Sequence, residues 1–544
     1  MPLTSDILFR NGNFWTGNAR SQSADFLICD DGLITSVGGR DESSGTHDSR
    51  KIVGLDGHFA MPGFIDSHAH FRSGGASLRQ INLRETASES EFSRAVRRYA
   101  ASHPPGKWIA GGNWDHETWR SKSLPTKELI DEFTPSTPVF LDRYDTHMAL
   151  VNSVVLRLAG IDRNTPDPQG GIIVRDNAGE PTGIVKDAAR EMVLKLIPKP
   201  SIGDLLDDAR TALRHARSLG ITSVHEIGTE RDLDAYVELR KLGELTARIY
   251  HILPLSSFSK IPELDASMVP NDNFIRIGAL KAFADGSLGA GTAWFFDPYD
   301  DDEGNYGISS DSLSSGRLEE WAVEADKNRL QLAVHAIGDR AVSEVLGLFE
   351  RIQETNPTWD RRFRIEHAQH VRPQDFIRMK RLNVIASVQP YHCIDDGRWA
   401  VRKIGENRAK TTYAFKTMSD RNIPLAFGTD WPVAPLNPME GIHAAVTRQT
   451  IDGKTPGGWV PEQKVSVECA LSAYTQGGAF ASCSEDVKGT LEPGKLADIV
   501  VLSDNPFLVS HDQLKDIKVL MTIVGGKVVF AEGKFSDYHD DSSI

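Results

Sequence analysis

The sequence of 544 residues predicts an α/β protein. We expect a (β/α)8 TIM barrel, a small β-sandwich domain made from both chain termini, and an insertion after the first barrel strand. Three observations support this fold class. Short apolar runs alternate with helical patterns through the middle of the chain, which indicates a parallel sheet. There are eight such runs, the number that closes this kind of barrel. Both chain ends instead carry strand-like runs separated by glycine turns.

The two chain ends share a pattern that is typical of antiparallel strands. Residues 5–60 alternate β-like runs with Asp-Gly and other turn pairs, and residues 488–507 repeat this pattern. We therefore expect residues 1–60 and 486–544 to form one composite β-sandwich domain. Residues 61–485 would then form the barrel domain. Two independent β-flaps are the alternative.

The eight barrel strands are expected where apolar runs end in turn or helix signals. They are residues 59–70, 220–228, 247–254, 274–286, 330–339, 362–370, 383–392 and 423–432. Helical patterns lie between most of them, for example at 202–220 and 340–353. The stretch from about 72 to 205 is too long for one crossover connection. We expect it to be an insertion that caps the barrel mouth.

Composition and charge argue against several classes of partner. The formal net charge is −14, whereas nucleic acids and anionic membranes require a basic face. No run of 18 apolar residues is present, so we expect no membrane partner. The four cysteines are widely spaced, and the N-terminus lacks a secretory pattern. These features favour reduced thiols and a cytoplasmic location.

Side chains that can bind metal ions stand in or at the ends of most predicted strands. They are His68, His70, Lys281, His335, His367 and Asp430. The C-terminal strand ends of a TIM barrel carry its active site. A single histidine at a strand end is most often structural, but packing alone does not explain the whole set.

The spacing of His68 and His70 suits a shared ion. Residues i and i+2 of a strand point to the same face, so both imidazoles can enter the barrel. Imidazole nitrogens and carboxylate oxygens suit zinc and related divalent ions. Lys281 lies in an apolar run, where an unpaired ammonium is costly, so we expect it to be paired, neutral or modified. The sequence therefore predicts a divalent-metal centre, zinc first, with one or two ions.

These motifs resemble those of the amidohydrolase superfamily. They run from "MPGFIDSHAHF" at 61–71 through "KAFADGSLG", "VHAIGDRAV", "RIEHAQ" and "GTDWPV" to "KGTLEPGKLADIVVL". The resemblance covers nearly the whole chain. It is greatest to the family 3 branch, which includes N-substituted formamide deformylases. In that family a barrel is joined to a β-sandwich made from both chain ends.

The resemblance also implies roles for the metal-competent residues. His68, His70 and Asp430 would bind the more buried ion, and His335 and His367 the more exposed one. Lys281 would be carboxylated by carbon dioxide and bridge both ions. Related proteins often carry a glutamate after "GEPTG", where this chain has Asp187.

The function that follows is metal-dependent hydrolysis of a C–N bond in a small-molecule amide, formamide or cyclic amide. Asp430 would accept the proton of the attacking water. A deaminase, an isomerase, a decarboxylase and a non-catalytic regulatory protein are the alternatives. His225 and Glu226 are expected to face the mouth. The predicted substrate contacts are Trp114, His147, His370, His392 and Trp294. No nucleic-acid partner is expected, and the chain is compatible with a homodimer.

Overall fold

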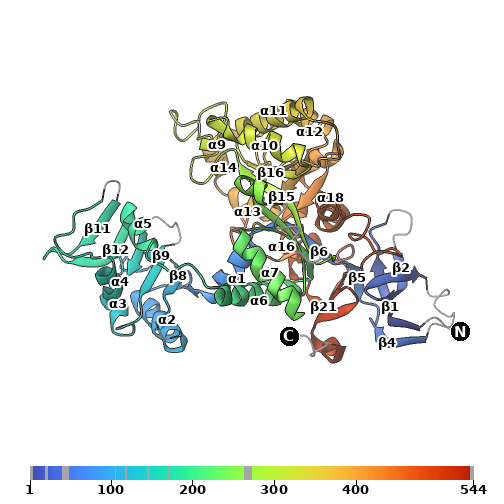
Figure 1. Cartoon of the computed structure of the whole chain (residues 1–544), viewed down its shortest axis with the longest axis horizontal. Helices are drawn as coiled ribbons and strands as arrows, with labels where there is room; N and C mark the ends of the chain where they lie inside the picture. The colour runs from blue at the N-terminus through green and yellow to red at the C-terminus, as the bar shows by residue number, and fades with distance from the viewer. Residues whose placement is uncertain are drawn as a thin grey trace. The chain divides into compact units, whose positions relative to one another are not determined.

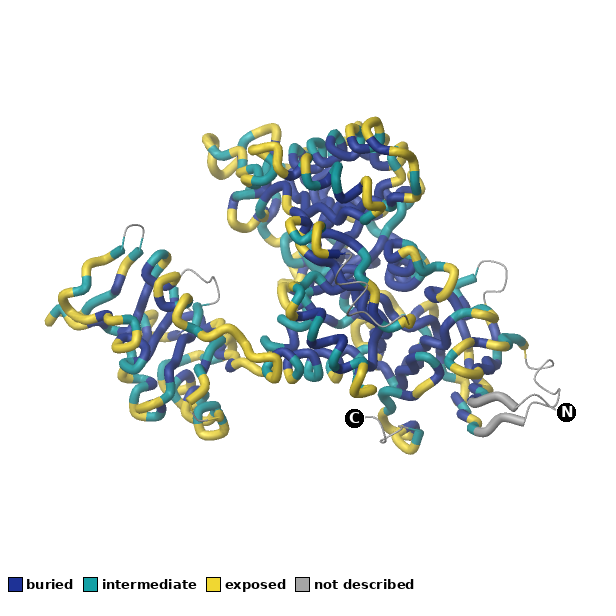
Figure 2. Tube along the Cα trace, viewed as in Figure 1, coloured by how far each residue is buried: buried dark blue, intermediate teal, exposed yellow. Residues whose placement is uncertain are grey.

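The computed structural model divides the chain into two compact units. One comprises Met1–Gly74 with Ala212–Ile544, and the other comprises Gly75–Thr211. The residues that the structure describes are 4–18, 23–39, 48–104, 106–116, 119–143, 148–168, 171–261 and 272–538. Each unit buries its own interior (Figure 2). No helix in this described part is both long and apolar enough to cross a membrane.

The first unit contains a barrel sheet of eight strands, and each strand runs parallel to its neighbours in the sheet (Figure 1). The strands are β6 (Phe64–Ala69), β13 (Ile221–Ile227), β14 (Arg248–Pro254), β15 (Ile275–Phe283), β16 (Gln331–Ala336), β17 (Arg364–His367), β18 (Ile385–Val388) and β19 (Leu425–Phe427). Each lies within one of the eight predicted runs. The predicted TIM-barrel fold is therefore confirmed.

The barrel closes through the residues that follow β19. The backbone N–H of Asp430 donates to His68 O at 2.7 Å, and that of His70 donates to Trp431 O at 2.8 Å. Gly428 permits this approach, because a Cβ there would lie 2.5 Å from the backbone nitrogen of His68. Closure therefore places Asp430 beside the first strand and its two histidines.

Helices connect the barrel strands, as the sequence predicts. The predicted helices at 202–220 and 340–353 are α6 (Ile202–Ser218) and α11 (Asp339–Thr355). The others include α7 (Glu230–Leu242), α10 (Arg317–Lys327), α12 (Pro373–Arg381), α13 (Pro390–Asp396), α14 (Ala400–Ala409), α15 (Phe415–Asp420) and α16 (Pro438–Thr447). Local sequence sets their ends. For α7, Thr229 and Asp232 form a capping box, and Gly243 ends the helix at φ 77°.

The two chain ends form one sheet, in the order β22-β21-β20-β5-β1-β2-β3, with β4 also paired to β1. The strands are β1 (Thr4–Trp15), β2 (Ser23–Asp30), β3 (Leu33–Gly38), β4 (Asp48–Gly54), β5 (Phe59–Pro62), β20 (Ile499–Leu502), β21 (Val519–Val524) and β22 (Lys527–Ala531). Buried residues from both chain ends, such as Leu27 and Met521, share one core cluster. We call this structure the terminal sheet. It excludes two independent flaps.

One predicted strand proves to be two. The apolar run 59–70 is divided at Gly63 into β5, which pairs within the terminal sheet, and β6, which begins the barrel. A Cβ at Gly63 would lie 2.2 Å from Thr222, so the chain passes between the two sheets where only glycine fits. β5 thus ends at Pro62, two residues past the boundary expected at residue 60.

The second unit overlaps the insertion expected at about 72–205, and it has a six-stranded sheet of its own. The order is β11-β12-β10-β9-β8-β7. The strands are β7 (Ile81–Asn82), β8 (Ile109–Trp114), β9 (Val139–Arg143), β10 (Met148–Val151), β11 (Gly171–Arg175) and β12 (Pro181–Asp187).

Both faces of this sheet are covered, because neighbouring residues of one strand belong to different core clusters. Leu141 packs with α2 (Glu89–Ser102), whereas Phe140 packs with α4 (Ser153–Leu158) and α5 (Ala188–Leu194). The insertion therefore has two apolar cores of its own. Its use as a cap stays a prediction.

Candidate metal centre

Three buried groups at the ends of barrel strands lie close enough to share one ion. The ligand atoms of His68, His367 and Asp430 all lie within 4.8 Å of one another. His68 Nε2 is 3.4 Å from Asp430 Oδ1. His70 Nε2 is 3.5 Å from the same oxygen. The structure thus brings the predicted His-x-His pair and Asp430 together, and it adds His367 to the same group.

The His68 ring is fixed from behind by a carboxylate. Its Nδ1 donates a short hydrogen bond to Glu366 Oε2. Because Nδ1 faces this carboxylate, Nε2 is the ring nitrogen left to bind an ion. Nε2 is buried and has no hydrogen-bond partner among the described residues. A carboxylate behind an imidazole is the usual way in which proteins orient a metal-binding histidine and raise its basicity. The donor set therefore fits a divalent ion.

Glu366 is held in turn by Arg364. The guanidinium donates to Glu366 Oε1 at 2.7 Å and also to Ser67 O, Ser387 Oγ and His225 Nδ1. Burial alone would raise the pKa of Glu366. Arg364 and His68 outweigh burial and hold that pKa well below its usual value. Glu366 is therefore an anion, and the negative charge lies behind His68 where it strengthens the ligand.

The other two predicted ligands lie around this group. The His335 ring centroid is 4.5 Å from that of His367, and its Nε2 hydrogen-bonds Gly286 O at 3.0 Å. Burial lowers the pKa of Lys281 to about 8 and that of His335 to about 3. His335 is therefore neutral, as a metal ligand must be. Within the described residues, the tight group is nevertheless His68, His367 and Asp430.

Two of the three grouped ligands have an unusual backbone. His367 has φ 74° and Asp430 has φ 61°. Such left-handed conformations are uncommon for residues with a side chain and cost roughly 1–3 kcal/mol. His367 is the last residue of β17, and Asp430 follows the end of β19 by three residues. Strain of this kind is typical of functional sites.

A cavity of about 390 Å³ opens onto the centre. Its lining includes apolar side chains and two further carboxylates, namely Phe283, Leu288, Ile337, Trp399, Val433, Asp395 and Asp396. Apart from histidines, Lys281 is the one basic side chain among the described residues that line it. The cavity is large enough for a small organic molecule, and its described lining offers no arginine to bind an anionic group.

His392, on α13, lines this cavity and approaches the carboxylate oxygen of Asp430 that His68 does not. His392 Nε2 is 3.5 Å from Asp430 Oδ2. Burial lowers the pKa of His392, but Asp430 outweighs burial and raises it. Burial alone would raise the pKa of Asp430, but His392 and His68 hold it well below its usual value. Asp430 is therefore a carboxylate with one oxygen beside each histidine.

Two other predicted substrate contacts do not line the cavity. Trp294 lies under the guanidinium of Arg340, whose carbon is 4.3 Å from the ring centroid. His370 is buried, with Nδ1 2.8 Å from Thr412 Oγ1 and the ring against Phe295. The turns after β15 and β17 direct these side chains into packing between loops. Neither residue is among the described residues that line the cavity, and both contacts stay predictions.

The remaining predicted contacts lie in the second unit or outside the described residues. Trp114 is fully buried in the core of the second unit, and its Nε1 donates to Leu141 O at 2.7 Å. It is therefore a packing residue with no surface left for a substrate. His147 lies outside the described residues. Asp187 is exposed and precedes α5 with φ 47°.

His225 and Glu226 do not face the mouth either. His225 lies inside the barrel and is fully buried, with Nδ1 2.9 Å from Arg364. Glu226 points away from that interior and accepts hydrogen bonds from the backbone N–H groups of Phe71 and Arg72. These neighbours on one strand point to opposite faces, as strand alternation requires.

Sequence reasoning missed three buried carboxylates around the centre. Besides Glu366, Asp66 accepts hydrogen bonds from Thr429 Oγ1 at 2.6 Å and from its own β6 neighbour, His68 N, at 3.1 Å. Asp285 accepts three backbone N–H bonds that join the loops after β15 and β16. Burial raises the pKa of Asp66 to about 6 and that of Asp285 to about 7. An acid inside an apolar strand run was the available signal, because such an acid needs partners.

Comparison with known proteins agrees with this site. The amidohydrolase family model matches residues 51–530, so the chain belongs to the amidohydrolase family. It is similar to Protein LONG AFTER FAR-RED 3 of Arabidopsis thaliana, with 37% identity over 97% of this chain and 92% of that protein. It is also similar to N-substituted formamide deformylase of Arthrobacter pascens, with 27% identity over 97% and 98% of the two chains.

A solved structure supports the same fold. An uncharacterized metal-dependent hydrolase from Pyrococcus furiosus is 32% identical to this chain. The TM-score is 0.77, and the match covers 92% of this chain and 99% of that one. The family resemblance seen in the motifs is confirmed, and the family and this structure support a metal-dependent hydrolase.

Proposed function

We propose that this protein hydrolyses a C–N bond in a small, uncharged amide, formamide or cyclic amide. The observation that carries the proposal is the convergence of His68, His367 and Asp430 on one point at the cavity, with His68 held by the Glu366 anion. The similarity to a formamide deformylase supports the C–N bond class.

The residues fit one tightly bound divalent ion, with zinc as the first choice. His68, His367 and Asp430 would hold it, and His70 lies close enough to add a fourth ligand. His335 and Lys281 would contribute to a second ion. Once bound, a divalent ion supplies Lewis acidity that polarises a carbonyl oxygen and makes water more acidic.

We further propose that Lys281 is carboxylated by carbon dioxide. Carbon dioxide adds to the neutral amine, the new N–C bond forms, and one proton is released. Burial, which lowers the pKa of Lys281 to about 8, increases the neutral fraction near neutral pH. The product is an anion with two oxygen ligands, which suits the neighbourhood of His335 and His367 better than an ammonium does.

Asp430 is the proton carrier of the proposed reaction. Its carboxylate accepts a proton from the attacking water as the new C–O bond forms, and it returns the proton to the nitrogen as the C–N bond breaks. One oxygen faces His68 and His70, and the other lies 3.5 Å from His392. His392 therefore keeps Asp430 ionised and oriented between metal ligands and substrate.

The cavity lining favours an apolar substituent on the substrate. Phe283, Leu288 and Trp399 supply aromatic and aliphatic surface. The carboxylates of Asp395 and Asp396 would repel an anionic group, and the departing amine would suit them better.

A substrate screen tests this proposal. Zinc-reconstituted protein is incubated with N-formyl amines, N-acyl amines, cyclic amides and aromatic amines, and the products are identified by mass spectrometry. We expect release of a carboxylate and an amine, or ring opening of a cyclic amide. Ammonia from an aromatic amine would identify a deaminase instead. Stoichiometric metal without turnover of any substrate would favour a regulatory protein that has kept the fold.

A further inference from the structure

A second cavity of about 270 Å³ lies at the opposite end of the barrel strands from the candidate metal centre. Its lining includes Arg248 and Arg276, at the starts of β14 and β15, and Lys488 in the segment that leads to the terminal sheet. The metal ligands stand at the other ends of parallel strands. The mechanism proposed above therefore does not use this cavity, which we call the floor cavity.

Lys488 is the least satisfied charged group of the floor cavity. The side chain is 8% exposed, and Nζ donates one hydrogen bond, to Ser223 Oγ at 2.5 Å. No carboxylate lies within 4.0 Å of Nζ in the described part of the chain. An ammonium has three N–H donors, and burial without a counter-charge is costly. Lys488 therefore lines the floor cavity with N–H donors that its one hydrogen bond does not use.

Arg276 adds a second cation without an acidic partner. Its guanidinium donates to two backbone carbonyls, Ser482 O at 3.1 Å and Cys483 O at 3.4 Å. No described carboxylate lies within 4.0 Å of it. Arg248, by contrast, donates to both oxygens of Asp498, at 2.6 and 2.8 Å. Of the three described cations that line the floor cavity, one is paired with a carboxylate, and Asp272, which also lines it, is paired with Arg240.

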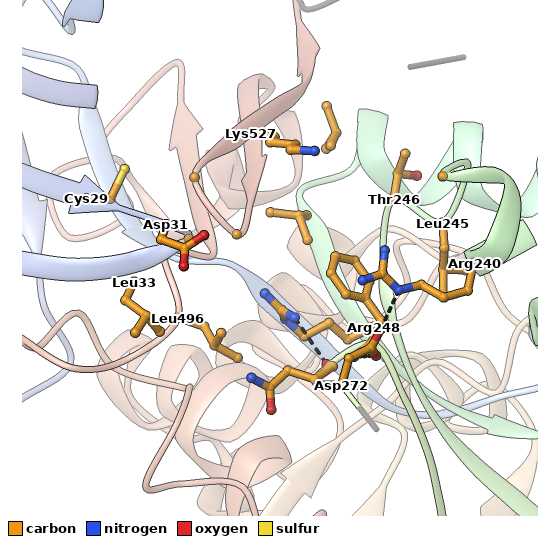
Figure 3. A pocket seen from close by; sticks show the side chains of 18 of the residues that line it. Cys29, Asp31, Leu33, Arg240, Leu245, Thr246, Arg248, Asp272, Leu496 and Lys527 are labelled. Atoms are coloured by element: carbon orange, nitrogen blue, oxygen red, sulfur yellow. Dashed lines mark hydrogen bonds and ion pairs between the residues drawn. The ribbon is translucent and has the colours of Figure 1, made fainter. Parts of the chain in front are cut away.

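The neighbouring cavity of about 600 Å³ provides a contrast (Figure 3). There the Arg240 side chain donates to Asp272 at 2.6 Å, and Arg248 is paired with Asp498 as described. Its remaining basic side chain, Lys527, is exposed to solvent. Although this cavity is larger, each buried cation among its described lining residues is paired with a carboxylate. Among the described lining residues of the two cavities, Lys488 of the floor cavity is the buried cation with no carboxylate within 4.0 Å.

We propose that the floor cavity binds a small oxyanion of the phosphate or carboxylate class, with Lys488 and Arg276 as its charged contacts. An arginine fork and a lysine point charge are the usual partners of such anions. A bound anion would also take up the unused donors of Lys488. Burial, aided by Arg248, lowers the pKa of Lys488 to about 7, and an anion would oppose this shift.

Calorimetry with inorganic phosphate tests the proposal. Phosphate is titrated into the metal-loaded full chain at fixed ionic strength, with chloride as the balancing ion, and thermal unfolding is followed in parallel. We expect one saturable site per chain and a Tm that rises with phosphate. Hydrogen bonds to charged groups contribute about 1.5–3 kcal/mol, so Arg276→Gln should weaken binding about 10- to 100-fold. Lys488→Met should remove it.

Arg317→Gln is the matched control. Arg317 is an exposed arginine on α10 that hydrogen-bonds Ser315 Oγ, and it lies outside both cavities. The Arg317→Gln variant should bind phosphate with the affinity of the parent. No saturable binding in the parent would overturn the proposal. So would equal affinity in the Arg276→Gln and Arg317→Gln variants, since this is the result expected for phosphate bound at the metal centre. If Lys488→Met does not fold, the Arg276→Gln variant, at an exposed position, still tests the proposal.

Discussion

The terminal sheet and the barrel interior fill their cores in opposite ways. The core of the terminal sheet is a cluster of aliphatic and aromatic side chains, with Leu27 and Met521 fully buried. In the barrel, Asp66, Arg364 and Glu366 have 0% exposure. Burial of apolar area stabilises the first core directly. The second core holds ionisable groups whose desolvation opposes folding.

The difference between the two cores shows that the buried polar groups are concentrated in the barrel, where the candidate metal centre lies. Arg364 has partners for its donors at Glu366, Ser67, Ser387 and His225, so the desolvated charges are almost fully satisfied. This network ends at His68, whose Nε2 has no hydrogen-bond partner in the described part of the chain. A satisfied network that leaves one imidazole nitrogen open is what a metal site requires. The following predictions test this comparison, from the largest expected effect to the smallest.

His68→Ala should lose the bound ion and abolish turnover while the fold is retained. The substitution removes the open nitrogen and leaves the terminal sheet unchanged. Metal content by mass spectrometry, activity and circular dichroism would be measured together. His443→Ala is the matched control, because His443 is a buried histidine on α16 outside the cavity. Parental metal content and activity in His68→Ala would contradict the role of the barrel network.

Lys281→Ala should also lose activity, but in a form that can be rescued. If the lysine carries a carboxylate, short-chain carboxylic acids can occupy the vacated space and supply oxygen ligands. We expect acetate or propionate to restore part of the turnover in Lys281→Ala and none in His68→Ala. Equal lack of rescue in both variants, with an unmodified Lys281 in metal-loaded crystals of the parent, would favour a single-ion site.

Asp430→Asn should keep most of the metal but lose turnover by a factor of about 10² to 10⁴. The amide keeps an oxygen ligand, but it does not carry a proton. The parental rate should fall as pH drops through the pKa of Asp430, which its neighbours hold well below the usual value. The variant should lack this acidic limb. Near-parental turnover would show another proton route, and His392, not His370, would then be the first residue to test.

Glu366→Gln should weaken metal binding by about 10- to 100-fold, because the anion behind His68 is lost. It should also lower the free energy of unfolding by about 3–5 kcal/mol, since Arg364 loses its charged partner. Leu27→Ala in the terminal sheet is the control. It should lower stability by about 2–5 kcal/mol and leave metal affinity unchanged. Equal metal affinity in both variants would remove the proposed difference between the two cores.

Most of the fold could be predicted because buried parallel strands leave apolar runs that are easily recognised. The division at Gly63 could not be predicted, since β5 and β6 form one apolar run that serves two sheets. The sheet of the insertion was missed as well. Its first strand, β7, has two residues, too few for any periodicity to be visible.

The site was predictable where spacing along one strand decides the geometry. His68 and His70 are two residues apart, and His367 and Asp430 lie at or soon after strand ends, so the sequence could propose all four. Contacts that depend on loop conformation could not be predicted from spacing along a strand. His370 and Trp294 follow strands closely, yet local turns direct them away from the cavity. To predict the contact between Glu366 and His68, one would have to know which strand lies across the barrel from β6.

Anomalous diffraction at the zinc edge, from crystals of zinc-reconstituted protein, tests the central claim most directly. We predict a strong peak within coordination distance of His68 Nε2, His367 and Asp430 in the parent. The same peak should be absent from His68→Ala crystals grown in parallel. Parent crystals with no anomalous peak between these three residues would contradict the account.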